Sequence, residues 1–129
     1  MFDKKSIITP IDKFINFALY HPKKGYYMQK TPFGQDGDFI TAPNISNIFS
    51  EMICLWIISY WEKFYKNKKI NIIELGAGNG EMMNKIISSA KKFKKFFSKS
   101  NFFIYEKSNR LIEIQKKELK QHRVKWLKN

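Results

Sequence analysis

The sequence predicts an α/β protein in which the second half of the chain opens a doubly wound parallel sheet. Two observations carry this prediction. Ile70–Leu75 is a short, isoleucine-rich run that is typical of a buried parallel strand, and a glycine-rich loop and a helical pattern follow it directly. Phe102–Tyr105 and Val124–Leu127 are further apolar runs, and between them lies a second helical pattern that Ser108 can cap. The order predicted from residue 70 is therefore strand, helix, strand, helix, strand.

A first helix is predicted near the start of the chain. Thr9 has the side chain of an N-cap, and Pro10 suits the first helical position. Apolar residues then recur at helical spacing as far as Leu19. The helix is expected to end near His21-Pro22, because a residue before proline is disfavoured in the helical region.

A long loop and a second helix are predicted before the first strand. Residues 22–45 are punctuated by glycine and proline, which predicts a mostly irregular segment with a short strand at Tyr26–Met28. Ser46 can cap the next helix, whose wide apolar face predicts that it is largely buried. We therefore divide the chain into an N-terminal helix–loop–helix extension, residues 1–68, and a partial Rossmann-like subdomain, residues 69–129.

Length and composition exclude several classes of protein. The 129 residues suit one domain, and a hydrophobic content of 43% is enough for a core, so global disorder is not expected. No apolar run reaches the roughly 18 residues of a membrane-spanning helix. The single cysteine, Cys54, cannot form an internal disulfide and is expected in the core. Met1–Tyr20 resembles neither a secretory signal nor a clear transit peptide, so a cytoplasmic location is predicted.

The net charge of +13 is a poor indicator of nucleic-acid binding in this chain. Lysine supplies 22 of the 24 basic residues, and the abundance of lysine, isoleucine and asparagine indicates a coding bias. Arginine, the preferred bidentate reader of phosphate and guanine, occurs only as Arg110 and Arg123. The basic and aromatic run Lys91–Phe97 is interpreted as a solvated helix end with an apolar stripe. We expect weak, non-specific polyanion binding at low salt.

The most informative pattern is the loop Glu74–Gly80, between the first predicted strand and its helix. Its glycines let the backbone turn sharply and let a ligand approach closely. Ligands of open α/β sheets bind outside the carboxyl ends of the strands, where this loop falls. A dinucleotide loop would place its third glycine one residue after Gly80, and the carboxylate of Glu81 would repel a pyrophosphate. The Gly-Lys-Ser/Thr sequence of a phosphate-binding loop does not occur.

The spacing of this loop instead suits S-adenosylmethionine, which carries no phosphate. Glu74 can help to hold the cationic methionine end, while Glu106, at the end of the second predicted strand, can accept both ribose hydroxyls. A tight turn beside a solvated strand end is the alternative interpretation. The order strand, loop, helix, strand, acid favours the cofactor. The predicted cofactor-binding residues are Glu74, Gly76, Ala77, Gly78, Gly80, Glu106 and Thr41.

A series of motifs occurs in order along the chain: Tyr20-His21-Pro22, Gly25-Tyr26-Tyr27, Pro32-Phe33-Gly34, Gly37–Pro43, Phe49-Ser50-Glu51 and Glu74–Gly80. With these motifs the whole chain resembles the N-terminal part of the MidA-like family of S-adenosylmethionine-dependent methyltransferases, whose mitochondrial members are arginine methyltransferases acting in complex I assembly. The resemblance implies a class I methyltransferase fold with an N-terminal extension beside the cofactor cleft. It also implies a protein arginine as methyl acceptor and the mitochondrial matrix as an alternative location.

Members of that family are considerably longer than this chain. The sequence ends where the third strand is expected, so we expect an exposed sheet edge and exposed apolar helix faces. We interpret the chain as the N-terminal piece of a split, truncated or decaying gene, and its activity on its own is left open. A complementing C-terminal chain is the partner that this interpretation implies.

The remaining polar candidates lie in the loop and at two histidines. Asp36 and Asp38 could bind a cation or orient a substrate amine, and the resemblance favours Asp38 as the candidate catalytic residue. An aspartate that fixes a turn explains them equally well. Thr41 carries the same two interpretations. His21 is expected to cap a turn rather than to act as a base, and His122 to be solvated. No metal ligand is predicted.

The aromatic residues Tyr26, Tyr27, Phe33 and Phe39 could form a wall for adenine or for a cation, although such residues more often form the core of a loop. Two function hypotheses follow from the whole sequence. The first is a methyltransferase, or its cofactor-binding half. The second is a non-catalytic basic fragment that binds nucleic acid or a partner chain through its exposed edge. Salt-sensitive polyanion binding without a response to S-adenosylmethionine would distinguish the second from the first.

Overall fold

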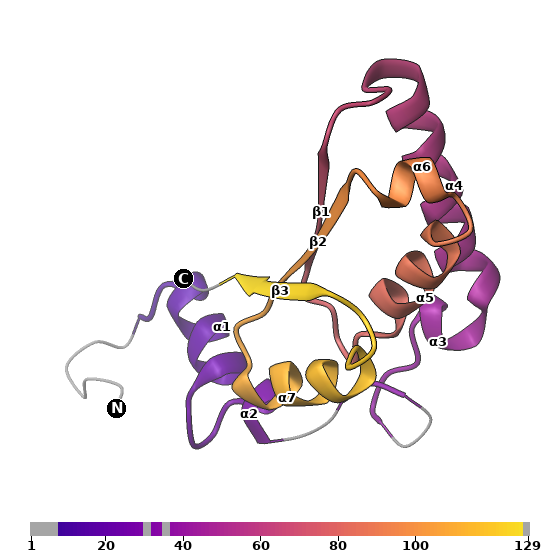
Figure 1. Cartoon of the computed structure of the whole chain (residues 1–129). Helices are drawn as coiled ribbons and strands as arrows, with labels where there is room; N and C mark the ends of the chain where they lie inside the picture. The colour runs from indigo at the N-terminus through magenta and orange to yellow at the C-terminus, as the bar shows by residue number, and fades with distance from the viewer. Residues whose placement is uncertain (1–7, 30–31, 35–36, 128–129) are drawn as a thin grey trace.

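The computed structural model describes residues 8–29, 32–34 and 37–127, and within these the predicted α/β order is confirmed. Its elements run in the order shown in Figure 1. They are α1 Ile11–Tyr20, α2 Tyr26–Gln29, α3 Ala42–Ile45, α4 Asn47–Phe64, β1 Ile70–Leu75, α5 Glu81–Ala90, α6 Lys94–Phe97, β2 Ser100–Tyr105, α7 Asn109–Glu118 and β3 Val124–Leu127. None of the described helices is long and apolar enough to cross a membrane.

The three strands form one parallel sheet in the order β1-β2-β3. Ile70 pairs with Ser100 and Leu75 with Tyr105, so the carboxyl ends of β1 and β2 lie side by side at one end of the sheet. In Figure 1, α4, α5 and α6 lie on one side of β1 and β2, and α1, α2 and α7 gather near β3. The order leaves β1 as an edge strand, with β2 as its partner in the sheet.

The core lies between α4, α5, α6 and the sheet. Trp61 of α4 is 1% exposed, and its ring meets Phe96 of α6 edge to face at a centroid distance of 5.4 Å. Its Nε1 donates to the Lys68 carbonyl at 2.9 Å, which ties the end of α4 to the turn before β1. Cys54 is buried as predicted and its Sγ donates to the Ile86 carbonyl of α5. The extension and the subdomain therefore share this core, and the predicted division at residue 68 stays a prediction.

Two local predictions in the N-terminal part are wrong. Pro10, not Thr9, is the N-cap of α1, because the extended ψ of 138° at Pro10 leaves it outside the helix. Tyr26–Met28 is not a strand but the start of the one-turn helix α2. That turn is held by tertiary contact, since the Tyr27 carbonyl accepts from the buried Ser108 hydroxyl at 2.6 Å. The predicted end of α1 at His21 is confirmed.

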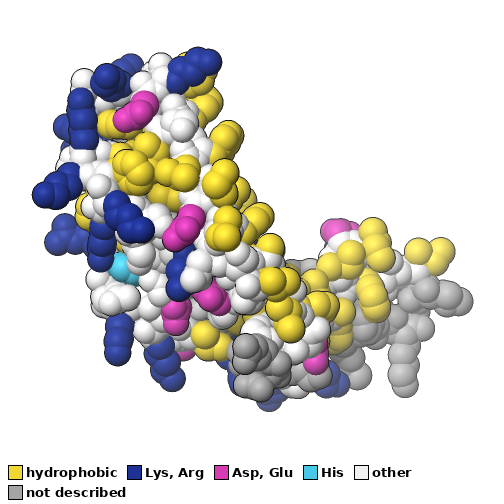
Figure 2. Space-filling view, turned by 90° about the vertical axis from the view of Figure 1, so that its right-hand side faces the viewer, with side chains coloured by type: hydrophobic (Ala, Val, Ile, Leu, Met, Phe, Trp, Pro, Cys, Tyr) yellow, Lys and Arg dark blue, Asp and Glu magenta, His cyan; other side chains and the backbone are white. Residues whose placement is uncertain are grey.

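The prediction that α4 is largely buried is also wrong. One face of α4 packs against α5, whereas the opposite face is exposed. Figure 2 shows hydrophobic side chains gathered in a band along one side of the molecule, away from most of the basic side chains. We call the following set the apolar face: Ile45, Ile48, Phe49, Met52, Leu55, Trp56, Tyr60 and Phe64. Ile73 and Leu75 are also exposed, but on the face of β1 that points away from the core shared with α4. An apolar helix face is buried only where another element covers it, and the described chain supplies such an element on one side of α4.

Two serines cap helices as predicted, and one of them also makes a tertiary hydrogen bond. Removing each hydroxyl shows how much stability the tertiary bond adds to that of the cap. Ser108 Oγ accepts from Leu111 N at the start of α7 and also donates to Tyr27 O, whereas Ser46 Oγ accepts from Ile48 N at the start of α4. We expect Ser108→Ala to lower the free energy of unfolding by about 2 kcal/mol and Ser46→Ala by about 1 kcal/mol. Urea denaturation of both variants measures this, and equal losses would contradict the tertiary role of Ser108.

Candidate functional site: a cleft at the carboxyl end of β1

A cleft of about 240 Å³ opens at the carboxyl end of β1. Both halves of the chain contribute to it. The N-terminal part supplies Phe33, Thr41, Pro43 and Phe49, and the β1–α5 segment supplies Glu74, Gly76, Ala77, Gly78, Asn79 and Met82. The structure therefore brings Glu74, Gly76, Ala77, Gly78 and Thr41 together from the predicted cofactor-binding set. Gly80 and Glu106 lie outside this lining.

The glycine loop depends on backbone conformations that other residues rarely adopt. Gly76, Gly78 and Gly80 have φ values of 70°, 54° and 89°. A side chain at Gly78 would begin 3.4 Å from the ring of Phe33, across the cleft. A side chain at Gly80 would begin 3.4 Å from the backbone of Gln115, so this glycine lets α7 pack closely on the start of α5. Gly78 therefore shapes the cleft, and Gly80 shapes the packing behind it.

Glu74 is the unusual group in the cleft. Desolvation by burial raises the pKa of its carboxyl to about 7. Its Oε2 is buried, and no described residue makes a hydrogen bond to it. A buried carboxylate is expensive to leave without a charged or hydrogen-bonding partner. The side chain therefore suits a cationic or hydrogen-bond-donating ligand in the cleft, and the ammonium and sulfonium of S-adenosylmethionine fit this requirement.

The raised pKa of Glu74 makes folding stability depend on pH. Between pH 4.5 and about 7 the folded chain keeps a proton that the unfolded chain releases, so stability is highest at the acidic end and falls as pH rises through this window. The expected loss is on the order of 3 kcal/mol. Glu74→Gln should remove this loss of stability with rising pH, whereas Glu62→Gln, on the exposed part of α4, should leave the loss unchanged. Urea denaturation from pH 4.5 to 8.5 tests this, and a stability that rises with pH across the window would contradict it.

Glu106 is held by the protein rather than solvated. Its Oε1 accepts from the backbone N of Lys107 at 2.8 Å and of Ser108 at 2.9 Å, and its Oε2 accepts from Gln115 Nε2 at 3.2 Å. It lines a second cavity, of about 700 Å³, beside Tyr20 and Lys107. These bonds fix the carboxylate at the end of β2, and its role in holding a ribose stays a prediction.

Gln115 is one of the residues supporting the site that sequence reasoning missed. It is fully buried, and its Nε2 also donates to the Gly78 carbonyl at 3.0 Å while its Oε1 accepts from Trp126 Nε1 at 2.9 Å. One side chain thereby joins the glycine loop, Glu106 and β3. The signal was present in the sequence, because Gln115 lies between Leu111 and Leu119 on the apolar stripe of the predicted helix.

A hydrogen-bond chain fixes the N-terminal wall of the cleft. Thr41 Oγ1 donates to Asn44 Oδ1 at 2.8 Å, and Asn44 Nδ2 donates to Glu81 Oε2 at the start of α5. Glu81 therefore holds the extension against the subdomain. The sequence alone indicates only that the Glu81 carboxylate would repel a pyrophosphate, and it does not indicate this structural role. Asn44 was not identified from the sequence.

The candidate catalytic residue Asp38 lies in the loop that leads to this wall. It is exposed and accepts a hydrogen bond from the Tyr26 hydroxyl at 2.6 Å. That bond raises the pKa of Tyr26 to about 12. Asp38 does not line the cleft, so a catalytic role stays a prediction. Asp36 lies outside the described residues.

The four aromatic residues of the loop form a cluster. Tyr27 and Phe33 are stacked at a centroid distance of 6.0 Å, and Phe39 contacts both Tyr26 and Phe33. Only Phe33 of this cluster reaches the lining of the cleft, where it faces Gly78. The cluster is therefore the core of the loop, and it presents one ring to the glycine loop.

The two histidines have structural partners. His21 Nδ1 accepts from the backbone N of Lys23 and Lys24, so it caps a turn as predicted. The prediction that His122 is solvated is wrong, because it is half-buried and bonded to Asn84 and Lys91. The described residues contain no cluster of histidine, cysteine and acidic side chains that could hold a metal ion.

Comparison with known proteins agrees with this geometry. Residues 52–129, more than half of the chain, match the family model described as "Putative S-adenosyl-L-methionine-dependent methyltransferase". The mitochondrial protein arginine methyltransferase NDUFAF7 of Bos taurus is 32% identical over 121 residues, covering 92% of this chain and 27% of its own length. The NDUFAF7 homolog of Drosophila melanogaster is 38% identical over 85 residues, covering 66% of this chain and 20% of its own length.

A solved structure shows the same fold. A protein of Burkholderia thailandensis, bound to S-adenosyl-homocysteine, superposes with a TM-score of 0.76 at 23% identity over 94% of this chain and 33% of its own. The sheet and its glycine loop thus define a partial Rossmann-like methyltransferase fold. The chain belongs to the MidA-like family of S-adenosylmethionine-dependent methyltransferases. It spans about a quarter of the length of its bovine relative and a third of the solved structure.

Proposed function

We propose that this chain forms the S-adenosylmethionine-binding part of a methyltransferase whose acceptor is an arginine of a protein. The observation that carries the proposal is the buried carboxylate of Glu74, which lines the cleft beside the glycine loop and has an oxygen that no described residue contacts by a hydrogen bond. The sulfonium of the cofactor is an already activated methyl donor, so positioning supplies much of the catalysis. Glu74, the loop backbone at Gly78 and the ring of Phe33 would position it.

The acceptor is proposed from the names of the relatives, which are protein arginine methyltransferases. An arginine acceptor needs carboxylates that orient its guanidinium and favour loss of a proton. Asp38 is the candidate for this role in the described chain, because it is an exposed acid held by Tyr26 close in sequence to the cleft wall at Thr41. Mitochondrial and cytoplasmic locations both remain predictions.

We further propose that a complementing C-terminal chain covers the apolar face and the open edge of β1. The relatives contain much more chain than the part matched here. Residues 31–62, which include most of the apolar face, contain none of the 24 basic residues of the chain. Further parallel strands could pair with the edge strand β1, and their side chains would cover the exposed apolar face of α4.

Isothermal titration of the purified chain with S-adenosylmethionine tests the cofactor proposal, after circular dichroism has established that the chain folds. We expect binding that releases a proton near pH 6, because the cationic ligand lowers the pKa of Glu74 again. Titration in buffers of different ionisation enthalpy measures this proton. Glu74→Gln should abolish the proton release, and Glu62→Gln should retain it. A folded chain that does not bind the cofactor would refute the proposal for this chain.

A further inference from the structure

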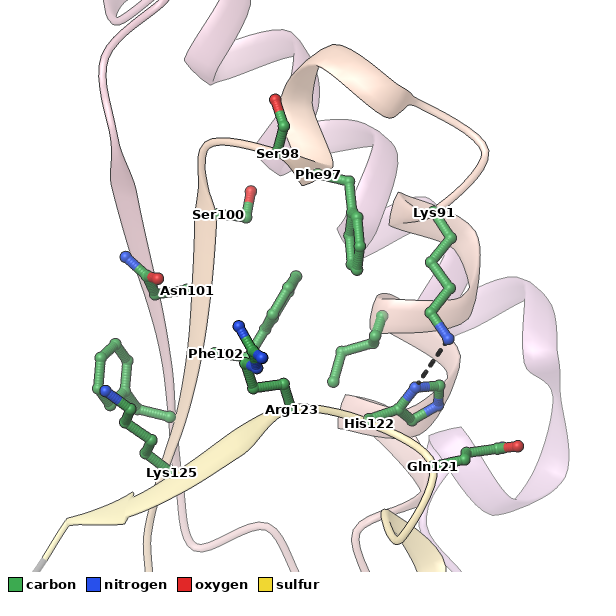
Figure 3. A pocket seen from close by; sticks show the side chains of 12 residues that line it. Lys91, Phe97, Ser98, Ser100, Asn101, Phe102, Gln121, His122, Arg123 and Lys125 are labelled. Atoms are coloured by element: carbon green, nitrogen blue, oxygen red, sulfur yellow. Dashed lines mark hydrogen bonds between the residues drawn. The ribbon is translucent and has the colours of Figure 1, made fainter.

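A second large pocket lies at the opposite end of the sheet from the glycine loop. It has a volume of about 780 Å³ and is formed where β2 and β3 begin, between the end of α5, α6 and the segment before β3. Figure 3 shows side chains from all of these elements around it. This volume is in the range of small-molecule sites. Nothing in the cofactor proposal uses the pocket.

The floor of the pocket is apolar and aromatic. Phe97 and Phe102 line it with their rings 6.0 Å apart and tilted by 34°, and Ile87 of α5 lies beside them. Phe97 is partly exposed, whereas Phe102 is 5% exposed. A flat ring placed against this floor would stack on Phe97, the more exposed of the two rings, and bury apolar surface there.

The rim of the pocket is cationic. Lys91, Arg123 and Lys125 line it, and no acidic residue is among the described residues of the lining. In Figure 3, Lys91 lies on the α5 side, and Arg123 lies between it and the strands in this view. Lys125 points away from Phe97, because its partner in the register is Phe103 and not Phe102, so it faces the other side of the sheet. Arg123 is one of the two arginines of the chain. A guanidinium and an ammonium without an acid between them favour an anionic group.

A hydrogen-bond network holds part of this rim in place. Asn84 Nδ2 donates to Glu118 Oε1, which leaves Asn84 Oδ1 to accept from His122 Nε2 at 2.8 Å. His122 Nδ1 then accepts from Lys91 Nζ at 3.2 Å, as drawn in Figure 3. This assignment makes His122 neutral, with its proton on Nε2. The ammonium of Lys91 is thus positioned at the pocket wall by a neutral partner.

We propose that this pocket binds a nucleotide, with the base against Phe97 and the phosphate at Arg123 and Lys91. The aromatic floor accounts for the base and the acid-free rim for the phosphate. A simple anion would not use the floor, and an uncharged aromatic ligand would not use the rim. The site is distinct from the cleft at the glycine loop and does not rest on the proposed methyltransferase function.

Isothermal titration with GMP, and with guanosine as the uncharged probe, tests this proposal at up to about 1 mM ligand. We expect GMP to bind and guanosine to bind at least about tenfold more weakly, since a charge-assisted contact contributes more than 1.4 kcal/mol. Arg123→Glu should weaken GMP binding by about tenfold or more. Lys117→Glu, on the exposed side of α7, should leave it unchanged, although both variants lower the net charge from +13 to +11.

Two further variants keep the test decisive. Lys91→Glu, which also lowers the net charge to +11, carries the same expectation if Arg123→Glu does not fold. Gly78→Val should retain GMP binding, because it alters only the other end of the sheet. The proposal is overturned if the folded chain does not bind GMP, if guanosine binds as well as GMP, or if Arg123→Glu and Lys117→Glu weaken binding equally. Loss of GMP binding in folded Gly78→Val would also overturn it, because the nucleotide would then occupy the cofactor cleft.

Discussion

Gly78→Val is expected to abolish binding of S-adenosylmethionine while leaving the chain folded. Two physical effects act together. The φ of 54° at this position is strained for a branched side chain, by about 1–3 kcal/mol, and the new Cβ would begin 3.4 Å from the ring of Phe33 across the cleft. The added methyl groups then occupy the space where a ligand approaches the loop. Isothermal titration should show at least a tenfold loss of affinity, about 1.4 kcal/mol or more.

Gly34→Val is the matched control for this prediction. Gly34 also has a left-handed φ, of 104°, but a Cβ there has open space around it, and the residue does not line the cleft. Both variants should lose similar stability in urea, and only Gly78→Val should lose the cofactor. If Gly78→Val binds with the wild-type affinity, the assignment of the glycine loop to the cofactor is wrong.

Trp61→Ala is expected to lower the free energy of unfolding strongly, whereas Trp56→Ala should leave that free energy nearly unchanged. The two tryptophans lie on the same helix, α4, but Trp61 is 1% exposed and Trp56 is 66% exposed. Truncating Trp61 removes its contact with Phe96, leaves a cavity and leaves the Lys68 carbonyl without its donor. The expected loss is about 3–5 kcal/mol, against less than about 0.5 kcal/mol for Trp56. Urea denaturation measures both.

Trp56 also tests the proposed complementing chain. If further chain covers the apolar face, Trp56 lies near the middle of the interface, and its truncation should weaken assembly by about tenfold or more. The assay is co-purification with the part of the Bos taurus relative that lies beyond its match to this chain. Lys66→Ala, in the exposed turn after α4, is the control that should assemble normally. Assembly that tolerates Trp56→Ala would place the partner elsewhere.

Most of the sheet and its loop could be predicted from the sequence, because their signals are local. The apolar run Ile70–Leu75 predicted β1 with the bounds that the structure shows, and Ser46 and Ser108 cap α4 and α7 as expected. Four of the predicted cofactor-binding residues, Glu74 and Gly76–Gly78, meet at one cleft, because they belong to β1 and the loop that directly follows it. These features depend on side-chain periodicity and on backbone conformations of adjacent residues.

Other features depended on residues that are distant in the sequence. Tyr26–Met28 is helical rather than extended because α7 supplies a hydrogen-bond donor to Tyr27. Gln115 joins the loop, Glu106 and β3, and no local pattern could show all three partners. The connection from Asn44 to Glu81 likewise spans the extension and the subdomain.

The sequence by itself determined the order of the strands, the position of the glycine loop and the family to which the chain belongs. Only the tertiary structure decided which apolar surfaces are buried. The periodicity of α4 shows that the helix is apolar on several sides, but burial depends on what lies opposite each side. Trp61 meets Phe96 and the core, whereas Trp56 lies on the exposed apolar face and Leu75 is exposed on the edge strand β1.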